Sequence, residues 1–168
     1  KEPFSGLVTQ GMICHETYRN ADGQWLFPDE VVNKGGDKFI SQLDGQNVIR
    51  GRSEKMSKSK KNVVDPEIII SDYGADTARL FMLSDSPPDR DLDWTESGVE
   101  GAWKYINKLW RMIDAPKNNL LHEMIKEPKK LNAEMLEIKQ KIHQTIQLVG
   151  SDIEKFHFNK AIARVREL

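Results

Sequence analysis

The clearest periodicity in the chain is helical and falls in residues 95–114. Apolar residues recur there at three- and four-residue spacing, which places them on one face of a helix. That face comprises Val99, Ala102, Trp103, Ile106, Leu109, Trp110 and Ile113. The two tryptophans are also compatible with stacking on nucleic-acid bases, but within an apolar stripe we expect them to pack in a core.

Residues that cap or stop helices mark two further elements. Residues 65–67 (Asp-Pro-Glu) combine an N-cap acid with proline at the first helical position, which predicts a helix start. Gly74 predicts the end of that helix. Asp76 is expected to cap the next helix, and the prolines at 87–88 are expected to stop it.

The last third of the sequence also has a helical pattern. Asn132 predicts the N-cap of a helix that reaches about residue 149. Its inward positions are expected to be Met135, Ile138, Ile142 and Val149. Residues 158–159 (Phe-Asn) open a final helix, and residues 115–130, with two prolines and several lysines, are predicted to be a linker.

The first third favours strands. Residues 6–14 hold a short apolar run broken by Gly11, which predicts a buried parallel strand whose backbone another segment approaches closely. Asp-Gly pairs at 22–23 and 44–45 are typical of hairpin turns, and Gly35-Gly36 marks another turn. Alternation at Phe39, Ser41 and Leu43 supports strands around the second hairpin. We expect residues 25–27 (Trp-Leu-Phe) to form the small core of this β-rich stretch.

Composition narrows the class of protein. The chain has 168 residues, a net charge of −1 and a single cysteine, Cys14. This charge argues against a general nucleic-acid binder, and the lone cysteine excludes an internal disulfide and fits the cytoplasm. No apolar run is long enough to span a membrane. Cys14 and His15 lack a second pair at ligand spacing, so we expect a packing role and no metal site.

The residues with the most specific chemistry are 55–59, which read KMSKS. Lys55 and Lys58 supply ammonium groups and Ser57 and Ser59 supply hydroxyl donors, a set that suits a polyphosphate. Lys60 and Lys61 follow; Lys61 is expected to be a solvent-exposed charge, whereas the role of Lys60 is left open. The nucleotide-binding P-loop pattern is excluded because residues 45–53 have the wrong glycine spacing and Arg52 in place of its lysine.

Four ordered motifs carry a family resemblance. The run KMSKSKKNVVDP (residues 55–66) is followed by YGADTARLFML (73–83), WTESGVEGA (94–102) and FNKAIARV (158–165). In this order they resemble the class I aminoacyl-tRNA synthetases and, through the WTESGVEGA segment, the leucyl-tRNA synthetases. Residues 6–13 also resemble the strand before the KMSKS segment in that family. Lys61 stands where many relatives have Gly or Asn.

The resemblance implies an α/β fold joined to an all-α part. Residues 1–17 are expected to end a Rossmann-like catalytic domain, and 18–52 to form a small β-rich leucine-specific insertion. Residues 53–94 would hold the KMSKS loop and stem-contact helices, and 95–168 the start of a truncated anticodon-binding helical domain. The family's H-I-G-H-like motif and editing domain are absent from the sequence, so we expect the chain to be a piece of a larger enzyme and inactive alone.

The resemblance also implies an activity. A leucine–tRNA ligase activates leucine with ATP to leucyl-adenylate and transfers the leucyl group to tRNA(Leu). Lys58 would act as the catalytic residue on the β and γ phosphates, with Lys55, Met56, Ser57 and Ser59 completing the ATP-binding segment. Mg²⁺ would ride on the ATP phosphates, and a monomer is expected. The alternatives are a valyl or isoleucyl enzyme, and a non-catalytic tRNA-binding module.

Overall fold

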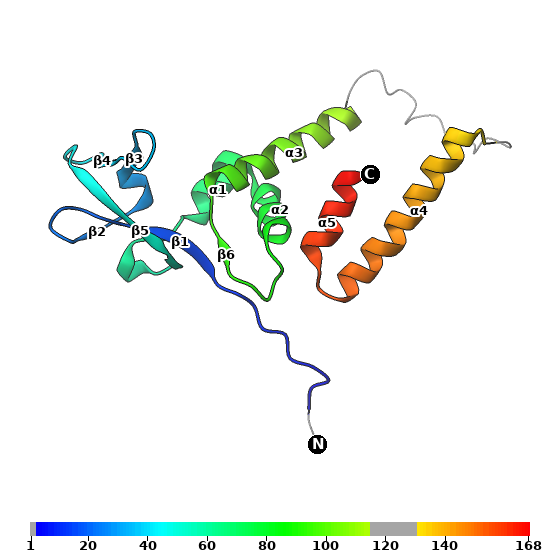
Figure 1. The fold of residues 1–168 in the computed structure, drawn as a ribbon, viewed down its shortest axis with the longest axis horizontal. Coiled ribbons are helices and arrows are strands. Elements are labelled where there is room, and N and C mark those ends of the chain that lie inside the picture. The colour runs from blue at the N-terminus through cyan, green and yellow to red at the C-terminus, as the bar shows by residue number, and fades with distance from the viewer. Residues whose placement is uncertain (1–2, 115–130) are drawn as a thin grey trace. The chain divides into compact units, whose positions relative to one another are not determined.

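The computed structural model describes residues 3–114 and 131–168 and contains both strands and helices (Figure 1). It divides into two compact units, Lys1–Gly74 with Asp89–Glu96, and Ala75–Pro88 with Ser97–Leu168. The mixed α and β character expected from the sequence is therefore present. The predicted linker at 115–130 lies outside the described residues.

The first unit is built on a curled, mainly antiparallel sheet in the order β2-β1-β5-β4-β3. Its strands are β1 (Ile13–Arg19), β2 (Trp25–Leu26), β3 (Val31–Asn33), β4 (Phe39–Ser41) and β5 (Asn47–Lys55). We call β1 to β5 and their connections the β module. A further short strand, β6 (Leu92–Asp93), pairs in parallel with the start of β1.

Glycines permit the tight turns of the β module. Gly23 and Gly45 have φ of 80° and 71°, a conformation that residues with a Cβ seldom adopt. Both follow an aspartate, so the predicted turns at 22–23 and 44–45 are confirmed. The predicted turn at Gly35-Gly36 is confirmed as well, with φ of 109° and 60°.

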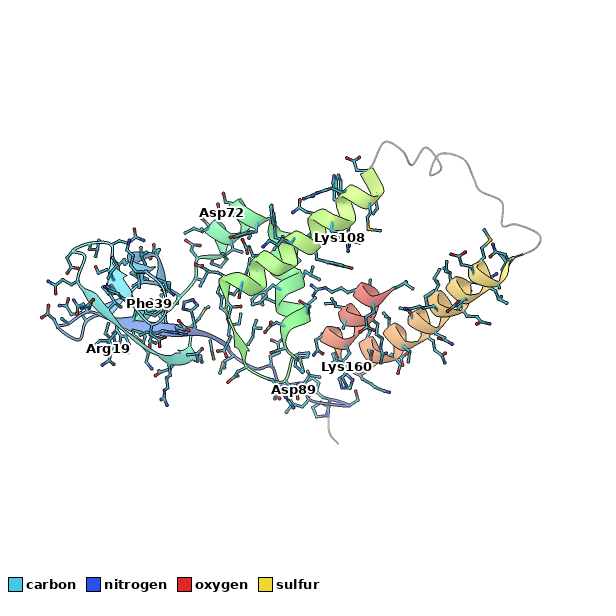
Figure 2. The ribbon with its side chains drawn as sticks, turned by 45° about the horizontal axis from the view of Figure 1, so that its top comes forward. Arg19, Phe39, Asp72, Asp89, Lys108 and Lys160 are labelled. Carbon is cyan, nitrogen blue, oxygen red and sulfur yellow. The ribbon has the colours of Figure 1, made fainter. Side chains whose placement is uncertain are left out.

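The core of the β module differs from the predicted one. It consists of Tyr18, Leu26, Phe39 and Val48, with Val31 packed against it; Phe39 is labelled among the strands in Figure 2. Of the predicted core residues only Leu26 belongs to it. Trp25 and Phe27 are half-buried, and a cation lies over each ring: the Arg19 guanidinium is 3.7 Å from the Trp25 ring centroid, and the Lys61 ammonium is 4.9 Å from that of Phe27. Leu43 lies beyond the end of β4 and is exposed.

The predicted buried strand at residues 6–14 is wrong for most of its length. Leu7 is 89% exposed, and the segment before β1 runs out from the sheet in Figure 1. The strand begins only at Ile13, where β6 provides a parallel partner at Ile13 and Cys14. The prediction for Gly11 is confirmed: a Cβ at this position would lie 1.9 Å from the carbonyl oxygen of Arg90.

Helix α1 (Pro66–Tyr73) has the predicted ends. The Asp65 side chain accepts a hydrogen bond from the Glu67 amide, and Gly74 closes the helix with φ of 85°. Helix α2 (Ala75–Asp85) ends before the prolines at 87–88, as predicted. Asp76 is not its N-cap, because it lies inside the first turn and pairs with Arg79.

Helix α3 (Glu96–Asp114) buries only the first part of its apolar stripe. Val99 and Ala102 are almost fully buried, whereas Trp110 and Ile113 are 69% and 64% exposed. The predicted core packing is therefore confirmed for Val99 and Ala102. Within the described residues it is wrong for the exposed members of the stripe, which are Trp103, Leu109, Trp110 and Ile113. Lys108, labelled in Figure 2, is also exposed on this helix.

Two helices complete the second unit, α4 (Ala133–Glu154) and α5 (Phe158–Glu167). The Asn132 side chain caps α4 through the Met135 amide, as predicted, and the helix continues beyond residue 149. Met135, Ile138 and Ile142 are exposed and not inward as predicted, whereas Val149 is half-buried. Asp152, buried near the end of α4, accepts a hydrogen bond from Arg164 Nε at 2.6 Å and thereby joins α4 to α5.

None of the helices in residues 3–114 and 131–168 has the length and apolar character that crossing a bilayer requires.

Candidate functional site

The KMSKS residues form a compact turn where β5 ends, and we call residues 55–62 the KMSKS turn. Strand β5 ends at Lys55, and a single 3-10 turn covers Lys58–Lys60. Lys61 closes it in the left-handed conformation, with φ of 55°, and its amide donates to the Lys58 carbonyl oxygen at 3.2 Å. The predicted site residues are therefore held in one local structure.

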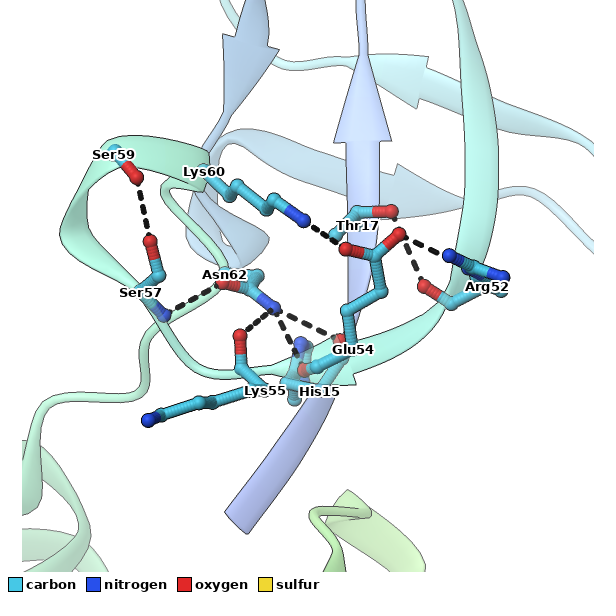
Figure 3. Close-up of polar contacts among 9 residues, drawn as sticks. All are labelled: His15, Thr17, Arg52, Glu54, Lys55, Ser57, Ser59, Lys60 and Asn62. Atoms are coloured by element: carbon cyan, nitrogen blue, oxygen red, sulfur yellow. Dashed lines mark hydrogen bonds and ion pairs between the residues drawn. The ribbon is translucent and has the colours of Figure 1, made fainter. Parts of the chain in front are cut away.

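Asn62 locks this turn from inside. Its side chain is fully buried, and its Oδ1 accepts a hydrogen bond from the Ser57 amide at 2.9 Å. Its Nδ2 donates to the carbonyl oxygens of His15, Glu54 and Lys55 at 3.1, 3.0 and 3.3 Å (Figure 3). A buried amide with all these partners fixes the turn on β1 and β5, because releasing it would leave several buried polar groups unpaired.

The two lysines of the motif that were assigned to ATP remain available to a ligand. Lys55 and Lys58 are both exposed, and within the described residues no carboxylate pairs with either ammonium group. Ser57 and Ser59 face each other across the turn with their Oγ atoms 2.7 Å apart. Met56 is half-buried, and its amide donates to the Ile13 carbonyl oxygen at 3.0 Å. Positive charge and hydroxyls are thus presented on a rigid base.

Lys60 is committed to a different partner. Its ammonium donates to the Glu54 carboxylate, which also accepts from Arg52 Nε at 3.1 Å (Figure 3). These contacts, Lys60 first, lower the pKa of Glu54 below its ordinary value. Lys60 is half-buried, and its charge is paired with that of Glu54.

The strands under the turn meet unusually closely at one point. Pairing between β1 and β5 runs from Glu16 opposite Ser53 to Tyr18 opposite Arg50, so two residues of β5 lie opposite Thr17 alone. The Thr17 hydroxyl donates to the Arg52 carbonyl oxygen at 3.2 Å. A Cβ on Gly51 would lie only 2.4 Å from that hydroxyl oxygen.

The thiol of Cys14 is shielded at the start of β1. Cys14 is buried in β1, and burial, followed by the charges of Asp91 and Asp93, raises the pKa of its thiol. Across residues 3–114 and 131–168, His, Cys, Asp and Glu side chains do not gather in a group of three that could hold a metal ion. The packing role expected for Cys14 agrees with its burial at the start of the strand.

Sequence reasoning identified the KMSKS residues but missed the group that holds them, Asn62. The available signal was an amide residue placed between a lysine run and Val63-Val64. Such a position lies where an exposed turn re-enters the fold, and a polar side chain there can satisfy the backbone groups of the turn. It also missed the ion pair between Glu54 and Lys60.

Comparison with known proteins places this turn in a family. The profile of the tRNA synthetases class I (I, L, M and V) matches residues 44–95, which include β5, the KMSKS turn and α1. The chain belongs to the class I aminoacyl-tRNA synthetases.

Within this class, the chain matches a segment of the leucine–tRNA ligases. It is 60% identical to the leucine–tRNA ligase of Paramagnetospirillum magneticum over 168 residues, and 55% identical to that of Rhodospirillum rubrum. All or nearly all of this chain is covered in each case, but it spans only 19% of the length of either relative.

A solved structure supports the same assignment. It is the ternary complex of Agrobacterium radiobacter K84 agnB2 LeuRS with tRNA and LeuAMS. The match has a TM-score of 0.62 and 30% identity, and covers 68% of this chain and 15% of that one.

Proposed function

We propose that this chain supplies the KMSKS part of a leucine–tRNA ligase. Such an enzyme uses ATP to activate leucine to leucyl-adenylate and then transfers the leucyl group to tRNA(Leu). The observation that carries the proposal is the exposure of Lys55 and Lys58 on a turn whose base is fixed by buried Asn62. Preorganised charge of this kind stabilises negative charge that develops during a reaction.

The chemistry of activation assigns a role to each part of the turn. The leucine carboxylate attacks the α-phosphorus of ATP, and pyrophosphate leaves with the electrons of the broken bond. Lys58 contacts the β and γ phosphates and stabilises the charge that grows on the leaving group, and Lys55 supports the same triphosphate. Ser57 and Ser59 offer hydroxyl donors to phosphate oxygens.

Magnesium fits this arrangement through the substrate. The donors presented by the turn are ammonium and hydroxyl groups, which suit phosphate oxygens; the ammonium groups repel a cation, and residues 55–62 contain no carboxylate to bind one. Mg²⁺ bound to the ATP phosphates would neutralise part of their charge. The residues of the turn would then orient the triphosphate and stabilise the remaining charge on the leaving pyrophosphate.

The domain assignment is also a proposal. Residues 1–17 would end a Rossmann-like catalytic domain, and 18–52 would be the leucine-specific insertion, the stretch that contains most of the β module. Residues 53–94 would provide the KMSKS loop and stem contact, and 95–168 would begin the anticodon-binding helical bundle. The exposed apolar residues of α3, such as Trp110 and Ile113, are consistent with a helix that has more partners in a longer protein.

Leucine is proposed over valine and isoleucine because the similar proteins are named leucine–tRNA ligases. The test is ATP–pyrophosphate exchange by a full-length ligase that carries this segment, measured with each of the three amino acids. We expect exchange with leucine and transfer to tRNA(Leu), both of them abolished or greatly slowed by Lys58→Ala. Preference for valine or isoleucine would assign the segment to those enzymes, and tRNA binding without exchange would support a non-catalytic module.

A further inference from the structure

Lys61 is held by an aromatic side chain, although the sequence predicts a solvent-exposed charge. Its ammonium nitrogen lies 4.9 Å from the ring centroid of Phe27 in the β module. Lys61 is half-buried and has a positive φ of 55°, which is uncommon for a residue with a side chain. An unusual backbone conformation together with a specific side-chain contact indicates a position determined by its surroundings.

Phe27 is a fixed partner for this lysine. Its amide donates to Glu30 Oε2 at 2.8 Å, and its carbonyl oxygen accepts from the Glu30 amide at 3.0 Å. Phe27 is the N-cap of the short 3-10 helix Pro28–Glu30, whose first residue is a conformationally restricted proline. Both the amide and the carbonyl group of Phe27 are therefore hydrogen-bonded, which fixes the backbone that carries the ring.

Lys61 is in turn connected directly to Lys58. The Lys61 amide donates to the Lys58 carbonyl oxygen, which closes the 3-10 turn. A displacement of Lys61 would therefore shift the residue to which we assign the phosphate contact. The next residue, Asn62, anchors the turn on the strands, so the turn has one support on β1 and β5 and another on Phe27.

The space around this second support is open. A hollow of roughly 570 Å³ has Ser59 and Lys61 among its lining residues, together with Trp25 and Asp44 of the β module. The flank of the turn next to Ser59 is therefore not packed tightly against the β module. On this flank, Lys61 provides a specific contact between the turn and Phe27 of the β module.

We propose that Lys61 is a positioning residue, and that its contact with Phe27 lets the β module set the position of Lys58 for the activation step. This inference rests on the proposed function and adds to it a role for the β module. A cation over an aromatic ring at a partly exposed site is moderately stabilising. Its loss should therefore slow activation and leave the turn, which Asn62 still holds, folded.

The test uses a full-length ligase that carries this segment, with ATP–pyrophosphate exchange as the assay. Lys61→Gly removes the cation but suits the left-handed backbone, and Phe27→Leu removes the ring. We expect each to lower kcat about two- to fivefold, in line with one cation–π contact, with KM for leucine unchanged. The double variant should be no slower than the single ones, because both remove the same contact.

Conservative variants and one control separate the possible outcomes. Lys61→Arg and Phe27→Tyr keep a cation and a ring and should retain most of the rate. Wild-type rates in Lys61→Gly, or additive losses in the double variant, would overturn the inference. Lys58→Ala tests the proposed function separately: if it slows exchange strongly while Lys61→Gly does not, the proposed function stands and only the positioning role fails. Should Phe27→Leu prove unstable on thermal melting, Lys61→Gly and Lys61→Arg decide the question alone.

Discussion

The side-chain amide of Asn62 donates a hydrogen bond to the backbone carbonyl oxygen of His15 at 3.1 Å, across 47 positions of sequence. This contact joins the end of the KMSKS turn to β1, whereas the other bonds of Asn62 stay within the turn and the end of β5. The turn is therefore fixed to the sheet by a side chain outside the five-residue motif.

Asn62→Ala should destabilise the fold and slow activation together. The substitution leaves buried backbone groups without partners, at a cost of about 1–3 kcal/mol for each group left unpaired. We expect a lower melting temperature and a lower kcat for ATP–pyrophosphate exchange in a full-length ligase carrying the segment. Asn47→Ala, at an exposed position of β5, is the matched control and should change neither. Equal melting temperatures for the two variants would contradict the anchoring role.

Lys58→Ala should slow leucine activation by about two to three decades, corresponding to roughly 3–4 kcal/mol for the loss of one preorganised charge contact. Leucine binding should change little, because the lysine is assigned to the phosphates. Steady-state exchange kinetics with varied leucine and ATP separate the two effects. Lys141→Ala, which removes an exposed lysine on α4, provides the comparison. A change below threefold would show that Lys58 is a surface charge.

Gly11→Ala should destabilise the first unit. The new methyl group would lie 1.9 Å from the Arg90 carbonyl oxygen, and a backbone atom cannot move away as a flexible side chain can. Overpacking of this kind typically costs about 1–3 kcal/mol, and occasionally more. Chemical unfolding of the chain should show a lower midpoint for Gly11→Ala than for Gly6→Ala, because a Cβ at Gly6 has open space around it. Equal unfolding midpoints for the two variants would mean that the segments around Gly11 and Arg90 can move apart at little cost in stability.

Acid should weaken the contact between α4 and α5. The hydrogen bond from Arg164 lowers the pKa of Asp152 below its ordinary value of 3.8. A carboxyl group whose pKa is depressed by folding stabilises the fold above its unfolded pKa, and this stabilisation is lost as pH falls through the folded pKa. Thermal melts between about pH 2 and pH 6 should therefore show a steeper acid loss in the wild type than in Asp152→Asn. Asp72→Asn, on an exposed position of α1, should leave the acid slope as in the wild type.

The parts of the fold that the sequence predicted correctly depend on local chemistry. The Asp65 cap, the Gly74 helix end, the Asn132 cap and the turns at Gly23 and Gly45 all depend on residues close in sequence. The burial predictions failed for side chains that no nearby segment of the described residues covers. Leu7 and Trp110 have apolar side chains in regular patterns, but a pattern does not show which surface will cover them.

In the candidate site, too, local features were predicted from the sequence, whereas contacts between distant residues were not. The KMSKS lysines were recognisable because their residue types reveal their chemistry. The roles of Asn62 and Lys61 depended on contacts with His15 and Phe27, which are 47 and 34 positions away in the sequence. Periodicity does not reveal pairings of this length, since they arise only when the strands have aligned.

The close approach of Thr17 to Gly51 has an evolutionary consequence. Because any Cβ at position 51 meets the Thr17 hydroxyl, a larger residue there requires a smaller one, such as glycine or alanine, at position 17. Such a change also removes the hydroxyl that bonds the Arg52 carbonyl oxygen. The dependence runs in one direction: a residue with a side chain at position 51 should appear among related sequences only together with a smaller residue at position 17, whereas position 17 can become smaller while Gly51 is kept. Substitution at position 51, beneath the KMSKS turn, is thus conditional on the residue at position 17.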